Sequence, residues 1–172
     1  ILDPVMYSTS GKKLLKKNAY KSLVRKLITV SHTVTPNVLE AETLSGVKIK
    51  NITQVKEAAK KIYSLGPKNI LIKGAHLKGK KIEDVFFNGK NFLYYPKRRI
   101  KTKNTHGTGC TLASAISACL ALGFDINESM DKSQKYIYDC IKYAPINIGK
   151  GQGPLNHFIN SNLVRKNTEL SN

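Results

Sequence analysis

KNTHGTGCTLASAISACLALG, residues 103–123, joins a glycine-rich turn to a run with the composition of a helix. Residues 111–122 are rich in Ala and Leu, which are among the strongest helix formers. Apolar residues recur there at helical spacing and predict one buried face: Leu112, Ile116, Cys119 and Leu120. Gly123 is the expected end of the helix. The stretch therefore predicts a turn–helix unit with Cys110 at the junction.

The turn Gly107-Thr108-Gly109 would lead directly into the N-terminus of this helix. Glycines let backbone N–H groups approach a ligand, and a helix N-terminus offers free donors and partial positive charge. Such a turn is suited to binding phosphate. Thiols at helix N-termini have a lowered pKa, so Cys110 is a candidate base or nucleophile beside an anion hole. Spacing alone leaves open the alternative that Cys110 is a small buried residue that opens the helix.

The composition is that of one ordinary globular domain. The chain has 172 residues, of which 41% are hydrophobic and 23% charged. It contains no apolar run of membrane-spanning length and no leader with a cleavage site. Its three cysteines form no CxxC pair, which fits a reducing compartment, and we expect Cys119 and Cys140 to lie in the core. We therefore expect a cytoplasmic protein with no membrane partner.

A net charge of +18 raises the possibility of a nucleic-acid partner. Against it, the lysines are spread along the whole chain, no nucleic-acid module is present, and Arg, which makes the commonest specific base contact, is scarce beside Lys. We favour a compositional preference for Lys, Asn and Ile, and expect no specific nucleic-acid partner.

Predicted strands and helices alternate along the chain. Helices are expected over residues 12–27, where the helix is either continuous or broken, over residues 38–44, after a cap at Asn51 or Thr53, and after Asp125, where Glu128 completes a capping box. Strands are expected at residues 1–2, 34–35 and 69–73, and in a hairpin of residues 82–87 and 92–95 around Asn88-Gly89. The pattern predicts an α/β fold, a mostly parallel sheet with helices on both faces in three layers.

Ligands of such sheets bind beyond the carboxyl ends of the strands. Asp3, Asn37, Lys73 and the Gly107 turn all follow predicted strand ends, so we expect them at one rim, in an enzyme. The chain opens inside a predicted strand at Ile1 without an initiator Met, and we expect it to be the back part of a longer protein.

Five blocks in order carry a family resemblance. They are DPVM (3–6) with SG (10–11), TPNVLEAETLSG (35–46), KGAH (73–76), KNTHGTGCTLASAI (103–116) and GQGPLNHF (151–158). The sequence resembles the hydroxymethylpyrimidine/phosphomethylpyrimidine kinases of thiamine biosynthesis, which belong to the ribokinase-like superfamily. The resemblance implies that residues 1–158 are the C-terminal part of a single ribokinase-like kinase domain, followed by a C-terminal tail at 159–172. It implies ATP-dependent phosphorylation of hydroxymethylpyrimidine and its monophosphate, with ATP and Mg²⁺ required, and a homodimer in the full-length protein.

The resemblance also implies roles for single residues at the turn–helix unit. Cys110 would be the base that takes the proton from the substrate hydroxymethyl group. Gly107, Thr108 and Gly109 would form the anion hole for the phosphoryl group in transfer. Lys135, in the last helix, would match a lysine that reaches the nucleotide.

Further residues implied by the resemblance concern the phosphates and the metal. Lys73 would contact the ATP phosphates, Asn37 and Glu40 would organise magnesium largely through water, and Asp3 would lie at the same corner. The residues alone leave open that Glu40 is a solvated carboxylate at a helix start and that Asp3 is a turn residue before Pro4.

For His76, His106 and His157 we expect structural hydrogen bonds, because their spacing fits no metal site. The family's front block, Gly-Ser-Asp-x-Ser-Gly-Gly-Ala-Gly, which supplies much of the pyrimidine pocket, has no match in this sequence. A pyridoxal kinase of the cysteine type therefore stays an alternative, as does a non-catalytic protein that binds nucleotides or polyanions.

Overall fold

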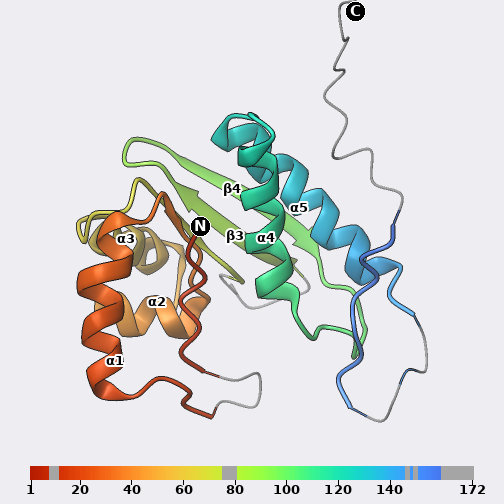
Figure 1. The fold of residues 1–172 in the computed structure, drawn as a ribbon, viewed down its shortest axis with the longest axis horizontal. Coiled ribbons are helices and arrows are strands. Elements are labelled where there is room, and N and C mark those ends of the chain that lie inside the picture. Colours follow the sequence, from red (N-terminus) through yellow and green to blue (C-terminus); the bar gives the residue numbers. More distant parts are fainter. Residues whose placement is uncertain (8–11, 75–80, 146–147, 149–150, 160–172) are drawn as a thin grey trace, which may run out of the picture. The chain divides into compact units, whose positions relative to one another are not determined.

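The structure, a computed structural model, describes residues 1–7, 12–74, 81–145, 148 and 151–159. The chain divides into two compact units, Ile1–Arg99 and Ile100–Asn172, and each is described by itself (Figure 1). The predicted turn at His76, the SG pair at 10–11 and the tail beyond residue 159 lie outside the described residues. Within the described residues, no helix combines the length and the apolar character that crossing a bilayer requires.

The first unit is built on a four-stranded sheet in the order β1-β2-β3-β4. The strands are β1 (Thr33–Val34), β2 (Asn69–Ile72), β3 (Lys81–Phe87) and β4 (Phe92–Arg98). β1 and β2 are parallel, and Leu2 adds a further parallel bridge to Val34. The pairs β2–β3 and β3–β4 are antiparallel, so our prediction of a mostly parallel sheet is wrong for this unit.

The reason for the mixed sheet is the length of the connections. Parallel neighbours need a crossover of about a dozen residues or more, and the chain from Ile72 to Lys81 is shorter than that. The Asn88-Gly89 turn likewise joins β3 to β4 as an antiparallel hairpin. Gly89 has φ +87°, and the Tyr63 hydroxyl fills the space where a Cβ would lie, so this position requires glycine.

Both α2 and α3 begin after an asparagine whose side chain caps the helix. α2 (Val38–Ser45) starts after Asn37 and ends at Gly46, whose φ of +70° is left-handed. α3 (Ile52–Tyr63) is capped by Asn51, whose side chain accepts a hydrogen bond from the backbone N–H of Gln54.

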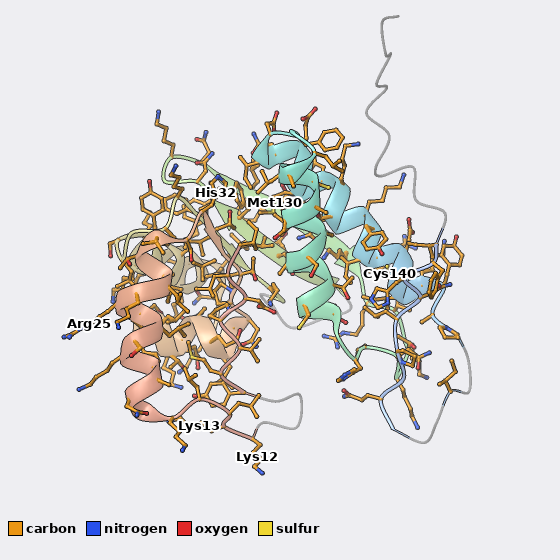
Figure 2. All side chains as sticks on the ribbon, in the orientation of Figure 1. Lys12, Lys13, Arg25, His32, Met130 and Cys140 are labelled. Atoms are coloured by element: carbon orange, nitrogen blue, oxygen red, sulfur yellow. The ribbon has the colours of Figure 1, made fainter. Side chains whose placement is uncertain are left out.

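The predicted helix over residues 12–27 is irregular. It begins at α1 (Lys17–Ser22), continues as a π-helical turn η1 (Leu23–Leu27) and ends as a 3₁₀ turn η2 (Ile28–Val30). Lys12, Lys13 and Arg25 in this region are exposed and project outward (Figure 2).

One hydrophobic core joins the sheet to α2 and α3. The stripe that α3 presents to the core is fully buried, and all four residues of β2 are buried as well: Val55, Ala58, Ala59 and Ile62, and Asn69 to Ile72. Because β2 is buried on both faces, the backbone that follows it has a fixed position at the edge of the unit. That edge carries Lys73.

The second unit contains two helices packed side by side, α4 (Thr108–Ala121) and α5 (Ile126–Lys142) (Figure 1). α4 begins three residues before the predicted start, directly after Gly107. The capping box at the start of α5 is confirmed, since the Asp125 carboxylate accepts from the N–H groups of Asn127 and Glu128 and Glu128 bonds back. Cys119 and Cys140 are buried, as predicted; Cys140 is labelled in Figure 2.

Asp84 is a charged residue in the buried part of β3, with a relative exposure of 4%. Its carboxylate accepts a hydrogen bond of 2.7 Å from the backbone N–H of Gly74 and one of 2.9 Å from Lys97 Nζ. Asp84 therefore ties the residue after Lys73 to the hairpin.

We expect Asp84→Ala to lower the free energy of unfolding by about 3 kcal/mol, because it removes the acceptor of two donors in a part-buried setting. Urea denaturation measures this loss. The control is Glu57→Ala, which breaks the exposed Glu57–Lys61 pair and should cost no more than about 0.5 kcal/mol. Equal losses in the two variants would contradict the structural role of Asp84.

Candidate active site

The parallel part of the first unit brings three segments to one edge. Leu2, β1 and β2 run in the same direction, so the residues that follow them leave the sheet together. The backbone N–H of Lys73 donates to the carbonyl of Pro36 over 2.8 Å, and Asn37 and Lys73 form a parallel bridge. Asp3, Asn37 and Lys73 therefore come from different strand ends to one corner of this unit.

Asp3 and Lys73 form an ion pair at this corner. Lys73 Nζ lies 2.6 Å from Asp3 Oδ1, and the two side chains are only 15% and 13% exposed. The Thr35 hydroxyl donates to the same carboxylate oxygen over 3.2 Å. The Asp3 carbonyl does accept from Val5 N, as a turn residue would, but its carboxylate also fixes the lysine. Asp3 is thus more than a turn residue.

Glu40 is buried, with a relative exposure of 2%, so its interpretation as a solvated carboxylate is wrong. Its Oε2 accepts from the backbone N–H of Asn37 over 2.9 Å, and its Oε1 accepts from that of Met6 over 3.2 Å. Asn37 Oδ1 in turn accepts from Glu40 N, which completes a capping box. Burial raises the pKa of the Glu40 carboxyl, and the N–H of Asn37 and the charge of Lys73 partly offset that effect.

These carboxylates fit a magnesium ion by donor type. Among the described residues no group of three or more His, Cys, Asp or Glu is arranged to hold a metal. Magnesium, however, is commonly held by one or two carboxylates and keeps several waters. Each oxygen of Glu40 retains a lone pair beyond its N–H partner. A metal role for Asp3 and Glu40, with Asn37 in support, stays a prediction.

In the second unit, Gly107 turns the chain into α4. Its φ of +84° is left-handed, and a Cβ added there would meet no atom within 4 Å. The glycine is therefore required by the backbone conformation and not by crowding. The Thr108 hydroxyl donates to the Thr105 carbonyl over 2.7 Å, so it closes the turn. The first-turn N–H groups of α4 are the kind of donors that bind anions.

Cys110 is exposed in the first turn of α4, so the alternative of a buried helix-opening residue is wrong. It lines a cavity of about 470 Å³ between α4 and α5. The cavity lining is mainly apolar, and the polar residues Thr111 and Ser114 lie toward the start of α4. Its lining consists of Cys110, Thr111, Ser114, Ala115, Ala118, Cys119, Leu122, Ser133, Tyr136 and His157.

Residues 153–158 form a C-terminal segment that makes hydrogen bonds to other parts of the second unit. The backbone N–H of His106 donates to the Gly153 carbonyl, and His157 Nε2 lies 2.9 Å from Thr111 Oγ1. The hydrogen-bonding role expected of His157 is thus observed, and His106 bonds through its backbone.

Sequence reasoning missed Thr111 and Thr35 as partners of candidate residues. Each stands next to a candidate motif, but no spacing rule connects Thr111 with His157 or Thr35 with Asp3.

Lys135 is exposed on α5 and is not among the residues that line the cavity. Its predicted contact with a nucleotide stays a prediction. The expectation that Asp3, Lys73 and Cys110 share one rim involves both units and stays a prediction as well.

Comparison with known proteins identifies the family. The sequence profile of the phosphomethylpyrimidine kinase family matches residues 1–156. A hydroxymethylpyrimidine/phosphomethylpyrimidine kinase of Rhizobium meliloti is 39% identical over 160 residues, which are 92% of this chain and 60% of that protein. A thiamine biosynthesis bifunctional protein of Geobacter sulfurreducens is 39% identical over 165 residues, 96% of this chain and 34% of that protein. The chain thus spans 60% of the length of the first relative and 34% of the second.

Solved structures agree with this assignment. A phosphomethylpyrimidine kinase of Clostridium difficile shares 41% identity, with a TM-score of 0.69 over 81% of this chain and 55% of that chain. A pyridoxal kinase of Staphylococcus aureus, solved with AMP-PCP, shares 30% identity, with a TM-score of 0.81 over 90% of this chain and 56% of that chain. The predicted ribokinase-like α/β fold is confirmed, and the chain belongs to the phosphomethylpyrimidine kinase family.

Proposed function

We propose that this chain supplies the catalytic base and the phosphate-binding groups of a kinase. The kinase transfers the γ-phosphoryl group of ATP to 4-amino-5-hydroxymethyl-2-methylpyrimidine and then to its monophosphate. The observation that carries the proposal is the exposed Cys110 in the first turn of α4, directly after the left-handed Gly107. The names of the relatives from Rhizobium meliloti and Bacillus subtilis support the pyrimidine substrate.

In the proposed reaction, the Cys110 thiolate takes the proton from the substrate hydroxymethyl O–H. The freed oxygen attacks the γ-phosphorus, the bond from that phosphorus to the β,γ-bridging oxygen breaks, and ADP leaves. The N–H groups of Gly107, Thr108 and Gly109 bind the phosphoryl oxygens in transfer. Positive charge at the start of α4 favours binding of the phosphoryl group.

Lys73 has a second role in the proposal, as a point charge for the ATP phosphates. Its ion pair with Asp3 supports this role, because the pair holds the ammonium at the strand end until phosphate replaces the carboxylate. Asp3, Asn37 and Glu40 would then hold magnesium, largely through water. The ion would supply neutralising charge for the phosphates.

We expect Cys110→Ser to lower kcat by about 10² to 10⁴-fold with little change in ATP affinity, because a serine hydroxyl does not ionise near neutral pH. Cys110→Asp should recover part of the rate, since a carboxylate can take the same proton. Carboxyl groups ionise at lower pH than thiols, so the acidic limb of kcat/KM should move to lower pH in the Asp variant. Steady-state kinetics over a pH series, with ATP binding measured by calorimetry, checks these outcomes.

Cys119→Ser is the matched control for Cys110→Ser, because Cys119 lies on the same helix but is buried. Its kcat should stay within a few-fold of wild type. Nearly full activity of Cys110→Ser would show that the thiol is not the base.

We expect Lys73→Met to weaken ATP binding by about 10 to 100-fold, the size of a charge-assisted hydrogen bond, with KM for the pyrimidine nearly unchanged. Lys61→Met is the control, since it removes the same charge from an exposed surface pair. Equal ATP affinity in the two variants would exclude a phosphate contact by Lys73.

Pyridoxal is the second candidate substrate. The observation that favours it is the higher TM-score with the Staphylococcus aureus pyridoxal kinase, 0.81 against 0.69, although identity is higher with the phosphomethylpyrimidine kinase, 41% against 30%. We expect kcat/KM to be at least about tenfold higher for the pyrimidine, a difference of about 1.4 kcal/mol in transition-state binding. A coupled ADP-release assay with each substrate in parallel decides between them. A preference for pyridoxal would overturn the proposed substrate.

A further inference from the structure

The C-terminal segment, residues 153–158, is fixed to α5 and to Tyr143, the residue that follows it, by three hydrogen bonds. Asn156 N donates to the Cys140 carbonyl over 3.0 Å, and Asn156 Nδ2 donates to the Tyr143 carbonyl over 3.1 Å. The Tyr136 hydroxyl donates to the carbonyl of His157 over 3.2 Å. Burial raises the pKa of Tyr136, so this hydroxyl keeps its proton and its role as a donor. The backbone that carries His157 is therefore anchored independently of the His157 side chain.

The His157 side chain bonds to α4 and not to α5. Its Nε2 lies 2.9 Å from Oγ1 of Thr111, 46 residues earlier in the chain. Thr111 is the residue after Cys110, and its backbone N–H donates to the Gly107 carbonyl over 2.9 Å. Thr111 thus closes the first turn of α4 through its backbone and connects that turn to the anchored segment through its side chain.

The surroundings of this bond make it suited to orient Cys110. Cys110, Thr111, Tyr136 and His157 all line the same cavity, and among the residues that the structure describes no Lys, Arg, Asp or Glu lines it. The imidazole and the hydroxyl are both rigid or short side chains, so the bond restricts the first turn with little loss of side-chain entropy.

We propose that His157 is a positioning residue, which acts through its hydrogen bond to Thr111 to fix the first turn of α4 and with it the direction of the Cys110 thiol. This inference rests on the proposed function for its kinetic consequence, because a thiol that serves as base must lie within hydrogen-bond reach of the substrate hydroxyl. Small errors in such geometry cost up to about 10²-fold in rate.

The kinetic test uses His157→Ala and Thr111→Val, which remove the two ends of the bond, in the protein that carries the kinase activity. Each should lower kcat by about 10 to 100-fold, with KM for ATP within about twofold of wild type. The double variant should be no worse than either single one, because both remove the same bond. His157→Gln, whose amide can bond in place of Nε2, should recover activity to within about threefold. Tyr136→Phe, which loosens the same segment without touching Thr111, is the control and should have a smaller effect.

A second test measures the reactivity of the Cys110 thiol directly and needs no kinase activity. Cys110 is exposed whereas Cys119 and Cys140 are buried, so alkylation of the native protein by iodoacetamide reports Cys110. In His157→Ala and Thr111→Val the alkylation rate at pH 7 should change by about threefold or more, in the same direction, and His157→Gln should restore the wild-type rate. Circular dichroism identifies any variant that does not fold, and the remaining variants then decide the outcome.

The two tests separate the two proposals. A Cys110 alkylation rate that depends on His157, in a protein without pyrimidine kinase activity, would support the positioning role and contradict the proposed function. Full kcat and an unchanged alkylation rate in both His157→Ala and Thr111→Val would overturn the positioning role while leaving the kinase intact. Fully additive losses in the double variant would also overturn it, because the two side chains would then act separately.

Discussion

The corner of the first unit where Asp3, Asn37 and Lys73 meet depends on the hydrogen bonds of one buried carboxylate, that of Glu40. It accepts one backbone N–H at the start of its own helix, from Asn37, and one from Met6 in the opening segment. Because a buried carboxylate without partners would be costly, both segments must stay where their N–H groups reach it. Asp3 is three residues before Met6, so Glu40 also limits where the Asp3–Lys73 pair can lie. An electrostatic requirement of one side chain thus positions the start of α2 and the opening segment.

In the second unit, backbone geometry and neutral groups position the candidate site residues, and no buried charge is involved in the described part of that unit. A left-handed glycine sets the direction of α4, and the first turn presents a thiol and backbone N–H groups. The neighbouring hydrogen bonds, from Thr108 to Thr105 and between Thr111 and His157, involve hydroxyl groups and an imidazole. The arrangement leaves the partial charge of the helix N-terminus without a competing carboxylate on the cavity lining. That is what a base and an anion-binding turn need at the same place.

The positions of the acidic residues explain how a strongly basic chain can still form a specific site. The chain has only 11 acidic residues against 29 basic ones. Glu40 and Asp84 are nevertheless buried, and Asp3 is largely so, each with defined hydrogen-bond donors. Many lysines, such as Lys12 and Lys13, lie exposed instead (Figure 2). Buried acids in a basic chain therefore mark structural and candidate functional positions better than the net charge does.

The sequence by itself determined the features that arise from hydrogen bonds between residues close in the chain. The Asp125–Glu128 capping box, the Asn88-Gly89 hairpin and the Gly107 turn before α4 all follow from local residue types and spacing. The order of motifs also pointed to the kinase family, which the comparisons confirmed. Even here, the start of α4 was placed three residues late, because glycine and threonine lower the helix propensity of its first turn.

Only the tertiary structure decided which of these residues meet. The Asp3–Lys73 pair joins residues 70 positions apart, and the Thr111–His157 bond joins residues 46 apart. No periodic pattern encodes such pairs, because they form only once separate strands and helices have packed. The burial of Glu40 and the exposure of Cys110 were likewise open in the sequence, since a short helix start and a glycine turn are compatible with either environment. Packing against the Met6 segment buries the first, and the cavity between α4 and α5 exposes the second.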